Sequence, residues 1–126
     1  MLGIPIGIVA AVICYFAMQL RMRKRIDESL DVWACHGMGG TWGTLATGLF
    51  ATLAINSSGA DGLFYGNALQ FLKQLAAVAT IWVFAFGMTW LIGKLVDVTV
   101  GLRVNETEET VGLDISQHGE RAYGEE

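Results

Sequence analysis

The fold of this chain is decided by residues 32–55, which read VWACHGMGGTWGTLATGLFATLAI. This stretch contains no Asp, Glu, Lys or Arg, and its ionisable side chains are those of Cys35 and His36. A helix of roughly 20 apolar residues crosses a hydrocarbon core of about 30 Å. We therefore predict that residues 32–55 form a transmembrane helix.

Two further stretches, residues 1–20 and residues 74–95, are also long and apolar enough to span a membrane. Lys94 lies at the end of the last stretch, where its long stem lets the ammonium group reach the interface. The chain has 126 residues, of which 53% are hydrophobic and 16% are charged, and its mean hydropathy is +0.48. These values predict an all-α fold, a polytopic membrane helix bundle.

The composition argues against the common soluble classes of protein. Between residues 32 and 93 only Asp61 and Lys73 are charged, which is too few for the solvated surface of a soluble enzyme. The net charge of −4 leaves no basic excess for nucleic-acid binding. Cys14 and Cys35 lie in apolar runs, so they predict neither a disulfide framework nor a zinc site. We expect no enzymatic activity, no cofactor and no metal.

The basic residues set the expected orientation, because Lys and Arg in short loops are retained on the cytoplasmic side. Residues 21–31 contain three Arg and one Lys, whereas the opposite loop, residues 56–73, contains only Lys73. The acidic segment 97–126 lies on the same side as residues 21–31 after two more crossings. We predict a membrane domain over residues 1–96, with its N-terminus outside, and a cytoplasmic C-terminal tail over residues 97–126.

Small residues recur at four-residue spacing along the helix predicted over residues 32–55. They are Gly39, Gly40, Gly43, Thr44, Thr47 and Gly48. Small side chains let the backbones of membrane helices approach closely, so we predict that this helix packs tightly against its neighbours. The alternative is that these glycines only reflect the general composition of membrane helices.

His36 lies about one turn into the same span, and an ionisable residue at that depth marks a functional site. A neutral imidazole donates a hydrogen bond at one ring nitrogen and accepts one at the other, so it can contact a small polar molecule without holding an ion. Two other roles stay open: a structural histidine bonded to a neighbouring helix, and a haem or metal ligand. Cys35 and His36 point about 100° apart on a helix, which argues against chelation of one ion by both.

Three blocks of the sequence resemble the ammonium transporter family, the ammonium, methylammonium and Rhesus-type channels. They are residues 27–51, residues 94–104 and residues 106–123. The first is similar to the family's tenth helix, the second to the end of its eleventh helix, and the third to its cytoplasmic tail. The resemblance implies that this chain is the C-terminal part, with the last three helices, of an eleven-helix fold with inverted repeats. It implies a multi-pass protein of the plasma membrane.

The resemblance also implies a site. His36 matches a pore histidine, Val32 matches an apolar pore-lining position one turn earlier, and Asp31 matches a carboxylate near the inner mouth. In the family, each subunit of a homotrimer embedded in lipid has its own narrow hydrophobic pore for ammonium or ammonia, with methylammonium as an analogue. Ammonia needs only hydrogen-bond partners there, whereas the intact cation costs several kcal/mol to desolvate.

The tail of this family packs beneath neighbouring subunits, and a PII-type signalling protein docks onto it from the cytoplasm. The resemblance therefore implies a regulatory role for the end of this chain. The residues concerned are Gly112, Leu113, Asp114, His118, Gly119, Glu120 and Tyr123. Without the resemblance, the simpler interpretation is a solvated acidic tail that has no partner and carries His118 on its surface.

These inferences together predict a permease that transports ammonium or ammonia, with this chain as the C-terminal part of the transporter. The alternative is a small three-helix scaffold or accessory protein whose glycine faces bind another membrane protein, with His36 in a structural role. A membrane haem protein that uses His36 as a ligand is a third interpretation.

Overall fold

The computed structural model describes residues 3–121 of the chain. Its elements are α1 (Gly3–Lys24), η1 (Trp33–Met38), α2 (Gly39–Phe50), η2 (Leu63–Tyr65), α3 (Ala68–Thr99), α4 (Glu106–Val111) and α5 (Leu113–Ser116). Residues 3–121 contain helices and turns but no strand, which confirms the all-α class. The chain divides into two compact units after Val83.

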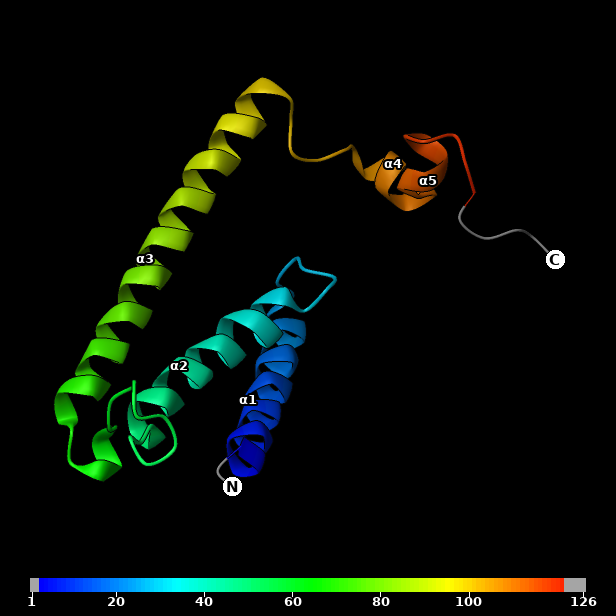
Figure 1. The fold of residues 1–126 in the computed structure, drawn as a ribbon. Helices are drawn as coiled ribbons and strands as arrows, with labels where there is room; N and C mark the ends of the chain where they lie inside the picture. Colours follow the sequence, from blue (N-terminus) through cyan, green and yellow to red (C-terminus); the bar gives the residue numbers. More distant parts are fainter. Residues whose placement is uncertain (1–2, 122–126) are drawn as a thin grey trace. The chain divides into compact units, whose positions relative to one another are not determined.

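Among the described residues, α1 and α3 are the two helices long and apolar enough to cross a membrane (Figure 1), each with a mean hydropathy of 2.0. Their large apolar side chains are exposed: Ile4 of α1 is 77% exposed and Val83 of α3 is 76% exposed. The last turn of α1 contains Arg21, Arg23 and Lys24, whose charges suit the negative end of the helix dipole. The exposed apolar surface of both helices is suited to contact with lipid or with further apolar helices.

The middle helix ends at Phe50, earlier than the predicted end at residue 55. The chain turns back at this point, because the N–H of Gly62 donates to the Ala51 carbonyl at 2.7 Å. A Cβ atom on Gly62 would lie only 2.7 Å from the carbonyl oxygen of Gly48. The end of the helix is therefore set by a backbone contact with a distant part of the loop, which the apolar pattern does not encode.

The helices α1 and α3 extend beyond the apolar segments that predict them. α1 continues past residue 20 to Lys24. α3 begins at Ala68, where the side chain of the preceding residue, Asn67, accepts a hydrogen bond from the Gln70 N–H at 3.2 Å. An Asn at this position satisfies one of the unpaired donors of the first turn. The membrane crossing of these helices and of the middle helix stays a prediction.

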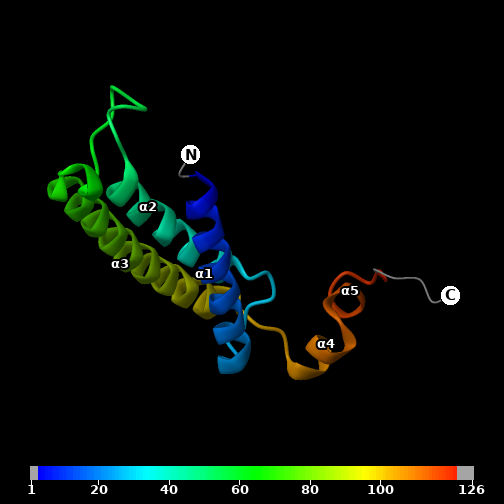
Figure 2. The ribbon, with the colours of Figure 1, turned by 90° about the horizontal axis from the view of Figure 1, so that it is seen from below.

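α1 packs against η1 and α2 (Figure 1, Figure 2) through small residues. The buried apolar residues of the described chain are Ala17, Ala34 and Ala46. A Cβ atom on Gly39 would lie 3.0 Å from Sγ of Cys14. The Cys14 side chain of α1 therefore fills the space beside this glycine. The indole Nε1 of Trp42 donates to the backbone carbonyl of Ile6 at 3.0 Å, which fixes α2 to α1.

α2 also approaches the first part of α3 closely. A Cβ atom on Gly48 would lie 3.1 Å from Cα of Phe71 and 3.0 Å from Cγ of Gln74. Farther along α3, the indole Nε1 of Trp82 donates to Oγ1 of Thr41 at 2.8 Å. The two helices are therefore in contact at two separate places, at Gly48 and at the hydrogen bond between Trp82 and Thr41.

In the second unit, the segment predicted as a solvated tail contains two short helices, α4 and α5. Asn105 and Glu108 form a capping box at the start of α4: the Glu108 N–H donates to Asn105 Oδ1 at 2.9 Å, and the Asn105 N–H donates to Glu108 Oε2 at 3.3 Å. Ser116 Oγ donates to the Glu108 carbonyl at 3.3 Å, and Gln117 Nε2 donates to Glu108 Oε1 at 3.1 Å. Glu108 therefore connects α4 to α5.

Substitution of Gly62 by Ala tests the close approach of the loop to α2. The new Cβ would meet two backbone carbonyls of α2 at 2.7 Å, so we expect a loss of about 1–3 kcal/mol in the free energy of unfolding. Gly43→Ala is the matched control, because a Cβ there meets nothing within 4 Å. Helical circular dichroism during heating in detergent micelles measures both. Equal melting temperatures for the two variants would contradict the close approach.

Substitution of Asn105 by Ala tests the capping box of α4. The Glu108 N–H loses its acceptor, and loss of an N-cap costs about 1 kcal/mol. We expect faster amide hydrogen exchange in residues 106–111, measured by mass spectrometry. Thr107→Ala, a change inside the helix that leaves the cap in place, serves as the control and is expected to leave exchange nearly unchanged. Equal exchange in both variants would show that the cap does not hold α4.

Candidate functional site

The loop between α1 and η1, residues 25–31, has an unusual backbone. Two non-glycine residues among residues 3–121 have backbone angles in the left-handed region: Arg25, with φ of +52°, and Asp31, with φ of +53°. Asp tolerates this conformation better than most residues do, because its short side chain forms local hydrogen bonds. The loop therefore turns sharply at its start and at its end, and the second turn leads directly into η1.

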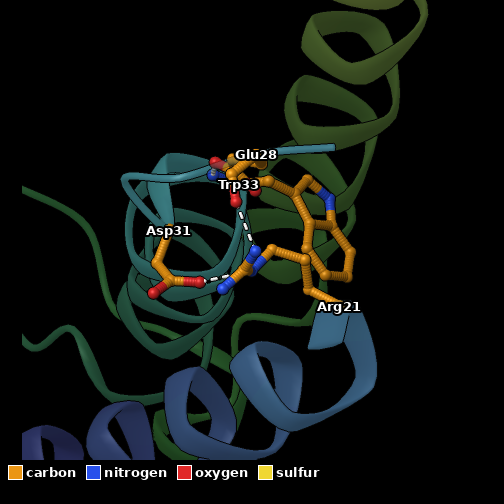
Figure 3. Close-up of polar contacts among 4 residues, drawn as sticks. All are labelled: Arg21, Glu28, Asp31 and Trp33. Atoms are coloured by element: carbon orange, nitrogen blue, oxygen red, sulfur yellow. Dashed lines mark hydrogen bonds and ion pairs between the residues drawn. The ribbon is translucent and has the colours of Figure 1, made fainter. Parts of the chain in front are cut away.

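Arg21 at the end of α1 bridges two points of this loop (Figure 3). Its Nε lies 2.6 Å from Oδ1 of Asp31 in an ion pair, and its Nη1 donates to the backbone carbonyl of Glu28. The side chains of Arg21 and Asp31 are only 16% and 21% exposed. An arginine fork is suited to this arrangement, because its donors are held in a fixed plane.

Glu28 holds the start of η1 with its side chain. Its Oε1 accepts a hydrogen bond from the Trp33 N–H at 2.7 Å. The first N–H groups of a helix have no partner within the helix, and a carboxylate near them is favoured by the helix dipole. The carbonyl of Glu28 is bound by Arg21, so the residue is held at both its backbone and its side chain. The loop and the helix start are thus one connected polar network.

His36 lies within η1, a π-helix over Trp33–Met38. A π-helix closes its hydrogen bonds over five residues rather than four, is rare, and appears mostly as a single turn at functional sites. The side chains of Val32 and His36 are both exposed in this chain, and within residues 3–121 no hydrogen bond holds the imidazole ring. Both ring nitrogens of His36 are therefore open to contact from a ligand or from another polypeptide.

Asp31, the predicted carboxylate of the inner mouth, has its charge matched by Arg21. The pair has no net charge, so Asp31 does not present a free negative charge to a cation. Its backbone carbonyl also accepts a hydrogen bond from the Cys35 N–H at 2.9 Å. Within the described part of the chain, no group of three or more His, Cys, Asp or Glu side chains lies close enough together to hold a metal ion.

The predicted stripe of small residues divides into two sets. Gly39 and Gly48 lie against α1 and α3, as described above, whereas a Cβ on Gly40 or Gly43 would meet nothing within 4 Å. The hydroxyls that complete the stripe bond within their own helix: Thr44 Oγ1 donates to the Gly40 carbonyl, and Thr47 Oγ1 to the Gly43 carbonyl. The spacing alone does not distinguish the packed glycines from the open ones.

Sequence reasoning missed Arg21, Glu28 and the hydrogen bond between Trp82 and Thr41. Arg21 belongs to a cluster of basic residues, and such a cluster predicts membrane orientation rather than a particular ion pair. Glu28 has the pattern of an ordinary solvated carboxylate in a loop. Thr41 Oγ1 donates to the Gly37 carbonyl at 2.7 Å while it accepts from Trp82. Nothing in the sequence pattern pairs Trp82 with Thr41, because the two residues lie 41 positions apart on different helices.

The residues predicted for the regulatory tail lie in the second unit. Gly112, with φ of +103°, separates α4 from α5, and Gly119, with φ of +67°, follows α5. The His118 N–H donates to the Leu113 carbonyl at 3.2 Å, and the Glu120 N–H donates to the Asp114 carbonyl at 3.0 Å. These bonds give residues 112–120 a compact turn structure. Tyr123 lies outside the described residues.

The chain is similar to known ammonium transporters. Residues 1–123 match the Ammonium Transporter Family. Ammonium transporter Amt1 of Archaeoglobus fulgidus is 52% identical over 121 residues, which cover 96% of this chain and 30% of the relative. The Ammonium transporter of Bacillus subtilis is 48% identical over 122 residues, with coverage of 96% and 30%. Ammonium transporter 1 of Dictyostelium discoideum is 41% identical over 122 residues, with coverage of 96% and 26%. The chain spans less than a third of the length of these relatives.

Substitution of Thr41 by Val tests the hydrogen bond from Trp82. The indole N–H loses its acceptor, and hydrogen bonds between membrane helices are worth about 0.6 kcal/mol on average and about 1.7 at most. We expect a loss in that range, measured by denaturant titration of helical circular dichroism. Thr44→Val is the control, because the Thr44 hydroxyl bonds only within its own helix. A Thr41→Val variant no less stable than Thr44→Val would contradict the contact.

Proposed function

Because this chain belongs to the Ammonium Transporter Family, we propose that it forms the C-terminal part of a transporter for ammonium or ammonia and that His36 lines the path of the substrate. One observation carries the proposal: within a family match over residues 1–123, the histidine of the middle helix lies exposed on a π turn with no partner for its ring among residues 3–121.

The chemistry of the substrate explains why a histidine suits this place. An ammonium ion entering an apolar path loses its hydration, and that loss costs several kcal/mol. Ammonia carries no charge and needs only a donor and an acceptor, which the two nitrogens of a neutral imidazole supply. Potassium has no proton to give up, so the same path disfavours it. The function is transport, with no covalent step.

The neighbours of His36 support passage of a neutral molecule. Val32, 51% exposed and one turn earlier, adds an apolar wall. Asp31 is neutralised by Arg21, so it attracts a cation weakly and does not retain it. An apolar wall and a neutralised carboxylate together favour release of ammonia over binding of ammonium.

The chain forms only part of the wall of the path, since it spans less than a third of its relatives. We propose that the rest of the transporter completes the path and that the open glycines, Gly40 and Gly43, face it. The proposed assembly is a homotrimer in the plasma membrane, with residues 97–126 in the cytoplasm as a site for a PII-type signalling protein. The match to a transport family does not favour the alternative of a scaffold with a structural histidine.

Substitution of His36 by Ala tests the proposed function. The background is a chimaera in which residues 1–123 replace the matching segment of the Archaeoglobus fulgidus relative. Loss of one desolvated hydrogen-bond partner costs about 1–3 kcal/mol, so we expect ammonium-driven flux to fall about tenfold. Flux is measured as the change of internal pH in liposomes after an ammonium gradient is applied.

His118→Ala is the matched control, because His118 lies in the tail and its loss leaves the path intact. The chimaera without substitutions gives the reference flux, and protein-free liposomes give the background. Flux in the His36→Ala chimaera equal to that of the His118→Ala chimaera would remove His36 from the path.

A further inference from the structure

The π turn that carries His36 is held at both of its ends by side chains from other helices. At its start, Arg21 of α1 binds Asp31 and Glu28, and Glu28 binds the Trp33 N–H. After its end, Trp82 of α3 donates to Thr41, whose hydroxyl donates to the Gly37 carbonyl. A segment held in this way keeps a conformation that it would not prefer by itself.

The register of this turn decides where His36 points. A π turn contains one more residue than an α turn, and each residue of a helix turns the chain by about 100°. Conversion of η1 to an α-helix would therefore rotate the side chains that precede the turn in the sequence relative to the side chains that follow it. Asp31 is suited to act as the hinge, because its left-handed backbone lies two residues before the first residue of the turn and its carbonyl accepts from the Cys35 N–H.

We infer that Arg21 is a positioning residue: by holding Asp31 and the Glu28 carbonyl, it keeps Trp33–Met38 in the π register and so sets the direction of the His36 ring. The consequence for transport rests on the proposed function, whereas the structural part does not. The ion pair is largely buried, and removal of one partner from such a pair leaves an uncompensated charge at the other. Loss of Arg21 would therefore drive Asp31 toward solvent and release the turn.

The two cysteines of the chain allow a direct test in the full 126-residue protein in detergent micelles. Cys35 lies in the π turn next to His36 and is exposed, whereas Cys14 is half-buried in α1, where its Sγ donates to the Cys35 carbonyl at 3.8 Å. N-ethylmaleimide reports the accessibility of each thiol, and diethyl pyrocarbonate reports that of His36. His118 is the internal reference for the second reagent. Mass spectrometry assigns each modification to its residue.

In Arg21→Gln, we expect the modification rates of Cys35 and His36 to change severalfold while the rate of His118 stays the same. Arg23→Gln is the matched control, since it removes an equal charge from the exposed face of the same helical turn. It is expected to leave all four rates unchanged.

Arg21→Lys separates charge from geometry, because lysine keeps the charge but lacks the fork that reaches two acceptors. We expect its rates to lie between those of the unsubstituted chain and those of Arg21→Gln. Unchanged rates in Arg21→Gln would overturn the inference. An equal change in Arg23→Gln would overturn it too, because it would show a general effect of lost charge at the end of α1 rather than a change of register caused by Arg21.

The same substitutions in the chimaera connect the register to transport. A small displacement of a positioned group is costly, so we expect Arg21→Gln to lower ammonium flux about tenfold while Arg23→Gln does not. Altered labelling of Cys35 with unaltered flux would overturn the effect on transport and leave the structural inference standing. Loss of the proposed function itself has a different signature, since it would appear as full flux in His36→Ala.

Discussion

The close packing of neighbouring helices against the glycines of residues 33–50 is the constraint on which the rest of the structure depends. Gly39 lies against Cys14 of α1, and Gly48 lies against Phe71 of α3. A Cβ at Gly39 would press on the Cys14 thiol at 3.0 Å, and a Cβ at Gly48 would press on the backbone of α3 at 3.1 Å. Because His36 sits only three residues before Gly39, the same close contact that joins α1 to this helix also fixes the place of the candidate site.

The helices could be predicted from the sequence, but their ends could not. The apolar stretches predict the all-α class, because a long apolar segment in a membrane can satisfy the hydrogen bonds of its backbone N–H and C=O groups within itself only as a helix. The end at Phe50 depends instead on the Gly62 N–H reaching the Ala51 carbonyl, a contact through space that no local pattern contains. For the same reason, the spacing of small residues identified a stripe but not which of its glycines face a neighbour.

The candidate site shows the same division. His36 could be singled out because an ionisable side chain in an uncharged span is rare and costly. The π turn around it could not, because its contacts come from residues distant in the sequence, such as Arg21 at the Glu28 carbonyl and Trp82 at Thr41, which the local pattern does not pair. The resemblance implies that Asp31 is a carboxylate near the inner mouth, which stays a prediction, and the structure pairs this carboxylate with Arg21 so that the two together carry no net charge.

The hydrogen bond from Trp42 has a consequence for how the chain can diverge. Its acceptor is the backbone carbonyl of Ile6, which every amino acid at that position supplies. The hydrogen bond between the two helices therefore does not depend on the side chain at position 6. It does depend on position 42, where a side chain with an N–H group at the distance of the indole Nε1 is required. The exposed apolar side chains of α1 can therefore be exchanged for other apolar side chains without loss of this hydrogen bond between α1 and α2.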